Sequence, residues 1–174
     1  MTAQKVKPTP TGPLQGIRIV DMTSVLMGPF ATQILADYGA DVMKIESERG
    51  DLLRLGGAMR HPKMGALYLQ SNRNKRSAVL DVKSKDGYEA VLKLCETADV
   101  FISNVRPAAL ARAGLAYDNI TARNPGIVYV SLVGYGQSGP YAKRPAYDDL
   151  IQGISGIPAL TSRAQPGTDR KSVV

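Results

Sequence analysis

Five short apolar segments, separated by stretches with helical periodicity, are the feature that most restricts how this chain can fold. The segments are residues 17–21, 41–46, 78–81, 99–103 and 127–133. The last, IVYVSLV, lacks polar alternation and is typical of a strand covered on both faces of a parallel sheet. Strands that alternate with helices predict an α/β, Rossmann-like parallel sheet with flanking helices. Because no strand is predicted after the fifth segment, we expect the sheet to be incomplete, with an exposed edge.

The helix expected after the first strand covers residues 30–38. Pro29 suits the first turn of a helix, where its missing N–H would have no partner in any case. Ile34, Leu35 and Tyr38 fall on one face at helical spacing. We expect that face to pack on the sheet.

The helix pattern between the third and fourth segments is the clearest in the chain. Ser84 is a favourable N-cap, and the helix is expected to run to residue 98. Its core stripe consists of Tyr88, Val91, Leu92 and Cys95. Shorter helices are predicted before Gly114 and over residues 117–123, and residues 66–71 fit a helix or a strand equally well.

A glycine-containing loop, residues 134–145, follows the fifth segment and carries Lys143 and Arg144. Ligands of parallel sheets bind at the carboxyl ends of strands, so two cations in this position indicate an anionic ligand. The loop also contains GYGQSG, a literal G-x-G-x-x-G. The dinucleotide fingerprint must open a helix, however, and here Pro140 and Pro145 follow instead. The pattern therefore favours an anion-binding loop over a nicotinamide or flavin site.

The charge balance favours anionic partners in general. The chain has 22 lysine and arginine residues against 15 aspartate and glutamate residues, a net charge of +7. This excess suits phosphorylated cofactors, nucleic acid or acidic surfaces. The basic residues are scattered, and with two Phe and no Trp the chain offers little for base stacking. We therefore expect no nucleic-acid partner.

The sequence predicts a cytoplasmic protein. A single cysteine, Cys95, excludes an internal disulfide framework, and its place in the helix stripe indicates core packing. Residues 1–12 have cations but no apolar core, so they are not a secretory signal, and we expect them to be a mobile leader. No apolar run is long enough to cross a membrane.

Several residues that could carry chemistry have plainer explanations. His61 is expected to be an ordinary loop residue, and Ser24 lacks a nucleophile elbow. Asp148 and Asp149 resemble an acid pair but are expected to cap the following helix. Asp21, at the end of a strand, fits a site residue or a turn cap. No metal-ligand spacing is present, so we predict no metal site.

Three blocks of the sequence resemble the N-terminal part of the family III CoA-transferases, which include formyl-CoA and carnitine-related transferases and the 2-methylacyl-CoA racemases. The blocks are PLQGIRIVDMTSVLMGPFATQILADYGADVMKIE, NRNKRSAVLDVKSKDG and GYGQSGPYAKRPAYDDLIQGISG. The resemblance runs continuously over residues 13–161. It implies that CoA and acyl-CoA are substrates, with no permanently bound cofactor, and that a carboxylic acid is the other partner.

The resemblance also implies how the chain is organised. Family members are more than twice as long, form interlocked homodimers and build a CoA-binding Rossmann-like domain from both chain ends. Residues 13–168 would then be the N-terminal part of that domain. Residues 169–174, DRKSVV, match one frame of a common sequencing adapter and are predicted to be a non-native tail. The family's catalytic aspartate would lie beyond Val174, because Asp169 comes too early, and the chain alone is expected to be inactive.

The family's CoA-binding positions carry over to four groups of residues. They are Val25, Leu26 and Met27 for the pantetheine; Leu80, Asp81, Val82 and Lys83 for the nucleotide; Asn104, Val105, Arg106 and Arg112 in a second nucleotide block; and Lys143 or Arg144 after the glycine loop. The resemblance implies that Arg112 meets a phosphate.

The chain departs from the family's pattern at three positions. Leu26 replaces the glutamine of formyl-CoA transferase, which argues against formate or oxalate as substrate. Ser47 replaces an arginine, so one phosphate contact is lost or moves to Arg49. Tyr147 stands where the racemases have a catalytic histidine, and the one histidine, His61, lies elsewhere. The resemblance therefore favours a CoA-transferase, with a racemase and a non-catalytic CoA-binding or interaction module as alternatives.

Overall fold

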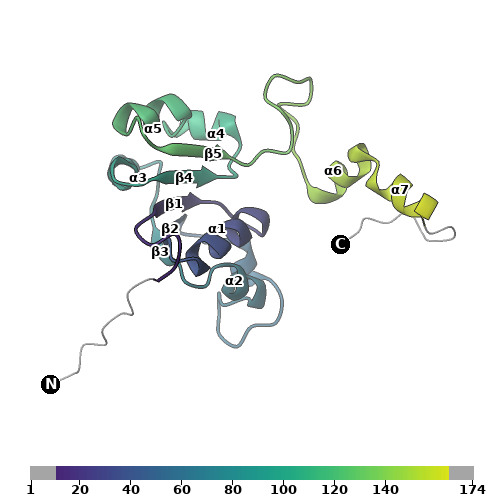
Figure 1. Cartoon of the computed structure of the whole chain (residues 1–174), viewed down its shortest axis with the longest axis horizontal. Coiled ribbons are helices and arrows are strands. Elements are labelled where there is room, and N and C mark those ends of the chain that lie inside the picture. The colour runs from purple at the N-terminus through teal and green to yellow at the C-terminus, as the bar shows by residue number, and fades with distance from the viewer. Residues whose placement is uncertain (1–10, 165–174) are drawn as a thin grey trace. The chain divides into compact units, whose positions relative to one another are not determined.

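The computed structural model describes residues 11–164, which fall into two compact units that divide between Leu132 and Val133. The first unit is a five-stranded parallel sheet in the order β3-β2-β1-β4-β5 (Figure 1). Its strands are β1 (Arg18–Met22), β2 (Asp41–Glu46), β3 (Arg76–Val79), β4 (Val100–Ser103) and β5 (Val128–Ser131). This order is that of a doubly wound Rossmann-like sheet, so the predicted fold class is confirmed.

Helices cover both faces of the sheet in the first unit. They are α1 (Met27–Asp37), the 3-10 helix η1 (Leu52–Leu55), α2 (Ala66–Ser71), α3 (Lys85–Glu96), α4 (Pro107–Arg112) and α5 (Tyr117–Arg123). One core layer joins the sheet to α3, α4 and α5 through Val91, Phe101 and Ile120. A second layer joins it to α1 through Ala36 and Ile102. None of the helices in residues 11–164 combines the length and apolarity needed to cross a membrane.

The predicted core stripe of α3 is confirmed. Val91, Leu92 and Cys95 are fully or almost fully buried, and the Ser84 hydroxyl accepts a hydrogen bond from the N–H of Gly87 at 3.0 Å. That bond satisfies one of the free N–H groups in the first turn of the helix. The sequence therefore sets both the start of α3 and the face that it buries.

The predicted buried face of α1 is only partly correct, because Leu35 packs against the second core layer but the other two residues of that face do not. Ile34 and Tyr38 are 38% and 54% exposed, whereas the polar Thr32 is completely buried. The reason lies beneath the helix, where the buried carboxylate of Asp21 accepts a hydrogen bond from the Thr32 hydroxyl at 2.6 Å. Gly28 lets the first turn of α1 lie close to Thr23, because a Cβ at position 28 would lie 2.4 Å from the Cβ of Thr23.

The expectation that the fifth strand is covered on both faces is only partly correct. Val128 is 57% exposed, and within residues 11–164 β5 pairs only with β4. Both faces carry core contacts, because the ring of Tyr129 stacks on Phe101 with centroids 5.1 Å apart and Val130 packs against the second core layer. Since β4 is its one pairing partner within residues 11–164, β5 is an edge strand of the described sheet.

The second unit, described from residue 133, contains α6 (Asp148–Ser155) and α7 (Ile157–Ala164). Gly156, with φ 79°, separates the two helices in a left-handed conformation that suits glycine. The predicted tail, residues 169–174, and residues 1–10 of the predicted leader lie outside the described residues.

Candidate functional site

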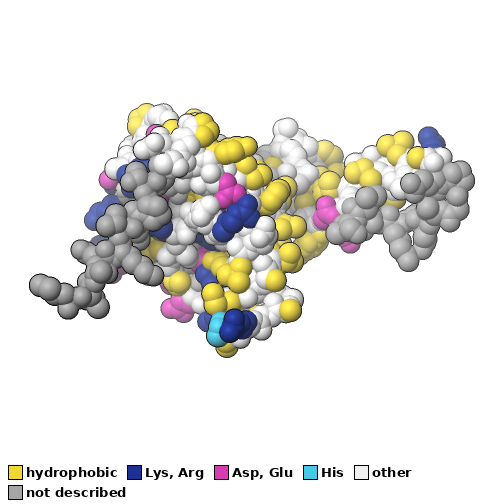
Figure 2. Space-filling view, turned by 60° about the horizontal axis from the view of Figure 1, so that its bottom comes forward, with side chains coloured by type: hydrophobic (Ala, Val, Ile, Leu, Met, Phe, Trp, Pro, Cys, Tyr) yellow, Lys and Arg dark blue, Asp and Glu magenta, His cyan; other side chains and the backbone are white. Residues whose placement is uncertain are grey.

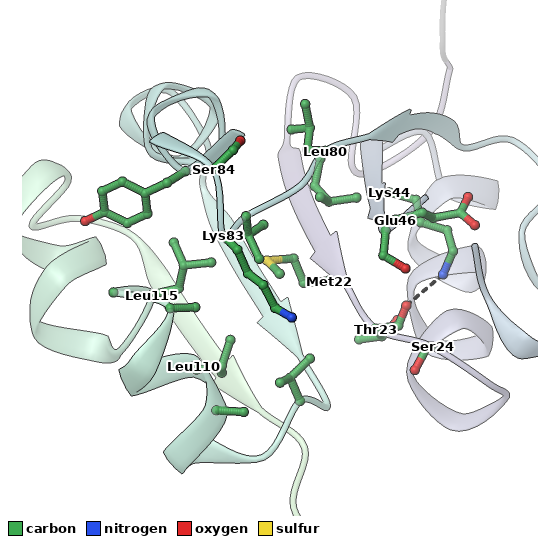
Figure 3. A pocket seen from close by; sticks show the side chains of 18 of the residues that line it. Met22, Thr23, Ser24, Lys44, Glu46, Leu80, Lys83, Ser84, Leu110 and Leu115 are labelled. Atoms are coloured by element: carbon green, nitrogen blue, oxygen red, sulfur yellow. Dashed lines mark hydrogen bonds between the residues drawn. The ribbon is translucent and has the colours of Figure 1, made fainter. Parts of the chain in front are cut away.

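A cavity of about 960 Å³ opens at the carboxyl ends of the strands in the first unit (Figure 3). Its walls include Met22 and Glu46, the last residues of β1 and β2. Leu80 and Val105, which follow β3 and β4, also line it. Because β2 and β4 flank β1 on opposite sides, the cavity lies at the topological switch point, where ligands of open α/β sheets bind.

The cavity combines an apolar interior with cationic side chains. Apolar walls come from Met22, Leu110 and Leu115, and the exposed cations are Lys83, Lys85 and Arg112. In Figure 3 the side chain of Lys83 extends toward the middle of the cavity. An elongated ligand with an apolar portion and a multiply charged anionic portion fits such a lining.

Five of the predicted binding residues line this cavity. They are Leu80, Val82, Lys83, Val105 and Arg112. They come from segments that are distant in the sequence, after β3, before α3, after β4 and at the end of α4. The structure therefore brings two of the predicted blocks together.

Three other predicted residues have structural roles beside the cavity. The Asp81 carboxylate accepts a hydrogen bond from the N–H of Lys83 at 3.0 Å. Asn104 donates through its amide to the carbonyl of Ser24 at 2.8 Å and accepts from the N–H of Ser24 at 3.0 Å. Arg106 is the N-cap residue of α4. The contacts of Asp81 and Asn104 hold loops in place, whereas Arg106 makes no side-chain cap, and none of the three residues lines the cavity.

The predicted pantetheine residues lie in the turn between β1 and α1 and at the first position of α1. Val25, Leu26 and Met27 are exposed and follow Ser24, which lines the cavity. Val25 has φ 71°, in the left-handed region that a β-branched residue rarely adopts. Its N–H donates to both carboxylate oxygens of Asp51, at 3.2 Å each.

A buried ion pair beneath this turn was not predicted from the sequence. The ammonium of Lys44 lies 3.1 Å from Oδ2 of Asp51, and both side chains are 1% exposed. Lys44 also donates to the carbonyl of Thr23 at 2.7 Å, drawn as a dashed line in Figure 3. The one signal was a lysine between the apolar residues Met43 and Ile45 of β2, because a buried charge there needs a partner.

A second network fixes the loop that follows β2. The Arg54 guanidinium donates to both carboxylate oxygens of Glu46, at 2.7 Å each, and lies 3.8 Å from the centroid of the Tyr68 ring. The Tyr68 hydroxyl donates to Glu46 at 2.9 Å. Burial alone would raise the pKa of Glu46, but hydrogen bonds from Arg54, Ser77 and Tyr68 outweigh it and lower that pKa to about 2. Glu46 is thus a firmly ionised anchor.

The glycine loop lies in the second unit and opens no helix, since α6 begins only at Asp148. This agrees with the interpretation that GYGQSG is not a dinucleotide fingerprint. The Arg144 guanidinium lies 4.6 Å from the centroid of the Tyr141 ring, and the Tyr141 ring packs edge-on against Tyr135. Lys143 is exposed. A role for the two cations in binding stays a prediction.

Asp148 and Asp149, which were expected to cap α6, lie inside the helix rather than at the N-cap position. Tyr147 is the N-cap residue, without a side-chain cap, and Asp148 and Asp149 are in the first turn. Negative charge there is favourable, because the helix dipole is positive at that end. Within residues 11–164 no cluster of His, Cys, Asp or Glu side chains is arranged to hold a metal ion.

Known proteins resemble this chain over almost its whole length. It is 44% identical over 156 residues to a succinate–glutarate CoA-transferase of Agrobacterium fabrum, covering 86% of this chain and 39% of that protein. It is 40% identical over 150 residues to the human succinyl-CoA:glutarate CoA-transferase, covering 86% of this chain and 34% of that protein. The chain therefore spans well under half the length of these relatives.

A solved structure agrees with the fold. A CAIB/BAIF family protein from Brucella suis superimposes with a TM-score of 0.87 at 38% identity, over 94% of this chain and 44% of that one. The family described as CoA-transferase family III matches residues 14–173. With this match, the Rossmann-like sheet and the two relatives at 40% identity or more, the chain belongs to CoA-transferase family III.

Proposed function

We propose that the complete gene product containing this chain transfers CoA between an acyl-CoA donor and a carboxylic acid acceptor. The observation that carries this proposal is the cavity at the switch point, with its apolar walls and its three exposed cations, Lys83, Lys85 and Arg112. CoA has the matching chemistry, an apolar pantetheine arm joined to a nucleotide with several phosphates. The printed names of the relatives point to the same reaction.

Within this proposal, Lys83 and Arg112 bind phosphate groups of CoA, and the exposed turn at Val25–Met27 contacts the pantetheine arm. Both cations are exposed at the cavity, so they can meet a phosphate without first breaking a buried ion pair. The apolar side chains of Leu80 and Leu110 exclude water from the adenine or the arm. The glycine-loop cations are further candidates.

The proposed reaction proceeds through an aspartyl nucleophile that lies outside this chain. Its carboxylate oxygen attacks the acyl carbon of the donor thioester, the C–S bond breaks, and CoA leaves as the thiolate. The thiolate then attacks the aspartyl carbonyl of the mixed anhydride and releases the donor acid as a carboxylate. The acceptor carboxylate next attacks the aspartyl–CoA thioester, the C–S bond breaks, and a second mixed anhydride and the CoA thiolate form. The thiolate attacks the acceptor carbonyl of that anhydride, which gives the new acyl-CoA and frees the aspartate carboxylate. Covalent catalysis of this kind splits one difficult step into easier ones.

A homodimer belongs to the same proposal. Met27, Phe30 and Ile34 leave an apolar stripe exposed on α1, and Figure 2 shows hydrophobic side chains on the molecular surface. Exposed apolar surface of this kind is typical of a subunit interface. Size-exclusion chromatography with light scattering on the complete gene product should give the mass of two chains.

The test of the function is turnover. The complete gene product is incubated with succinyl-CoA and a panel of mono- and dicarboxylic acids, and new acyl-CoA species are measured by mass spectrometry. We expect a new acyl-CoA together with an equal amount of succinate. Incubation with succinyl-CoA alone, followed by hydroxylamine, should convert the nucleophile to a hydroxamate and stop turnover. CoA binding without turnover of any pair would instead support a non-catalytic CoA-binding module.

The racemase alternative has its own signature. A 2-methylacyl-CoA racemase exchanges the α-hydrogen of its substrate with solvent, whereas CoA transfer leaves that bond intact. Deuterium incorporation into a 2-methylacyl-CoA in D₂O would therefore favour the racemase. Tyr147, exposed at the start of α6, argues against it, because it stands where the resemblance places the catalytic histidine of the racemases.

A further inference from the structure

The turn between β1 and α1 is held in a strained shape by an ion pair buried in the cavity wall. Val25 has φ 71°, and its N–H donates to both oxygens of Asp51. Such a conformation persists only when the surrounding structure enforces it. We propose that Lys44 and Asp51 are positioning residues, which fix this turn in the shape against which acyl-CoA binds. The inference rests on the CoA-binding function proposed above.

Lys44 holds the turn at two points. Its ammonium donates directly to the carbonyl of Thr23 at 2.7 Å. It also donates to Oδ2 of Asp51 at 3.1 Å, and that carboxylate in turn receives the N–H of Val25. One side chain from β2 therefore sets the backbone on both sides of Ser24. Thr23, Lys44 and Asp51 all line the cavity.

A third contact fixes the residue between these two points. Both polar atoms of the Asn104 amide bond the backbone of Ser24, one to its N–H and one to its carbonyl. Three consecutive residues of the turn are thus each held by a different part of the chain. The shape of the turn depends on these long-range contacts, since glycine, the residue best suited to this conformation, is absent from position 25.

A purely stabilising role explains the arrangement less well. A buried ion pair loses the hydration of two charges, and replacing it with apolar side chains of similar size is often neutral or stabilising. What Lys44 and Asp51 supply in this place is directional hydrogen bonding to Thr23 and Val25. That directionality is what a binding turn at a cavity wall requires.

The test compares CoA affinity in four forms of the complete gene product by isothermal titration calorimetry: wild type, Asp51→Asn, Val25→Gly and the double variant. We expect Asp51→Asn to weaken CoA binding roughly tenfold, the equivalent of about 1.4 kcal/mol. The double variant should recover most of that affinity, because glycine adopts positive φ without enforcement. Ile120→Val, a change in the buried core outside the cavity lining, is the control for lost stability and should leave the affinity unchanged.

The outcomes separate the inference from the proposed function. One outcome would overturn the positioning role alone. In it the wild type binds CoA, and folded Asp51→Asn binds CoA with an affinity within about twofold of the wild-type value. A double variant that recovers no affinity would also overturn that role, because the effect would then not pass through Val25. A wild type that binds no CoA overturns the proposed function and the inference with it.

A second comparison covers the case in which Asp51→Asn does not fold. Val25→Pro cannot adopt the observed φ, since proline is confined near −65°, whereas Val25→Gly can. Neither change alters the Lys44 and Asp51 side chains, but proline also removes the N–H that donates to Asp51. We expect the proline variant to bind CoA at least about tenfold more weakly than the glycine variant. Equal affinities would overturn the inference.

Discussion

The ammonium nitrogen of Lys75 lies 3.1 Å from Oδ2 of Asp21, and the two side chains are 1% and 0% exposed. Asp21 also accepts hydrogen bonds from the N–H of Thr23 at 2.8 Å and from the hydroxyl of Thr32 at 2.6 Å. Lys75 donates to the carbonyl of Pro29 at 2.8 Å. This pair therefore ties β1, α1 and the segment before β3 together beneath the candidate site, which favours the structural role over the catalytic one for Asp21.

Lys75 should titrate well below an ordinary lysine. Burial lowers its pKa from 10.5 to about 8, although the charge of Asp21 opposes the shift. Because the folded-state pKa is the lower one, the unfolded state binds more protons between pH 8 and 10.5, and the contribution of Lys75 to stability rises with pH across that window. NMR titration of lysine ¹³Cε signals should show one midpoint near pH 8 that Lys75→Arg removes. A titration in which every lysine changes only near its ordinary pKa would contradict this.

Glu46 should contribute to stability except in strong acid. Its folded-state pKa of about 2 lies below the ordinary 4.5, so the stabilisation is complete above pH 4.5 and is lost as the pH falls toward 2. Glu46→Gln should lower the free energy of unfolding by roughly 3 kcal/mol at neutral pH, from the size of the shift. Urea unfolding followed by circular dichroism should show that difference shrinking below pH 4.5.

The control for that experiment is the exposed ion pair between Asp41 and Arg76, whose side chains are 38% and 51% exposed. Asp41→Asn should change the free energy of unfolding by less than about 1 kcal/mol, because solvent screens such pairs. An equal loss in both variants would mean that the Glu46 network is no stronger than a surface pair.

Cys95 should be inert in the folded protein. It is completely buried in the α3 core stripe, and burial raises the pKa of its thiol to about 12. Thiolate is the reactive form, so Ellman's reagent at pH 8 should modify no Cys95 until denaturant is added. Rapid modification of the native protein at this residue would show that the core around α3 opens readily.

Arg112 should recognise a phosphate of CoA. Arg112→Ala should weaken CoA binding roughly tenfold, a typical loss for one charge-assisted hydrogen bond. Arg123→Ala is the matched control, since Arg123 also ends a short helix but lies outside the cavity lining and pairs with Glu89 and Glu96. If Arg112 meets the 3′-phosphate, dephospho-CoA should bind both the wild type and Arg112→Ala with similar affinity. Equal losses for Arg112→Ala and Arg123→Ala with CoA would rule out a specific contact.

The sequence was sufficient where local pattern decides the structure. The stripe of α3 and the Ser84 cap follow from helical spacing, and the five strands follow from apolar runs between turns. The cavity-lining positions Lys83 and Arg112 came from the family resemblance rather than from pattern. Each of these features is readable within one segment of the chain.

The features that could not be predicted depend on partners that lie in a different element or loop. The polar face of α1 is buried because Asp21 lies beneath Thr32, and Lys44 is buried because Asp51 comes back to it across a loop. Periodicity assigns an apolar face to the core and has no means of anticipating a buried charge pair. Whether the faces of β5 are covered likewise depends on other segments that pack against the strand.

The most direct test of the central claim is a crystal structure of the complete gene product with CoA. The account predicts CoA in the cavity at the carboxyl ends of β1 to β4, with phosphate oxygens within hydrogen-bonding distance of Lys83 or Arg112 and the pantetheine arm along the turn at Val25. CoA bound elsewhere on the protein, with this cavity empty, would contradict it.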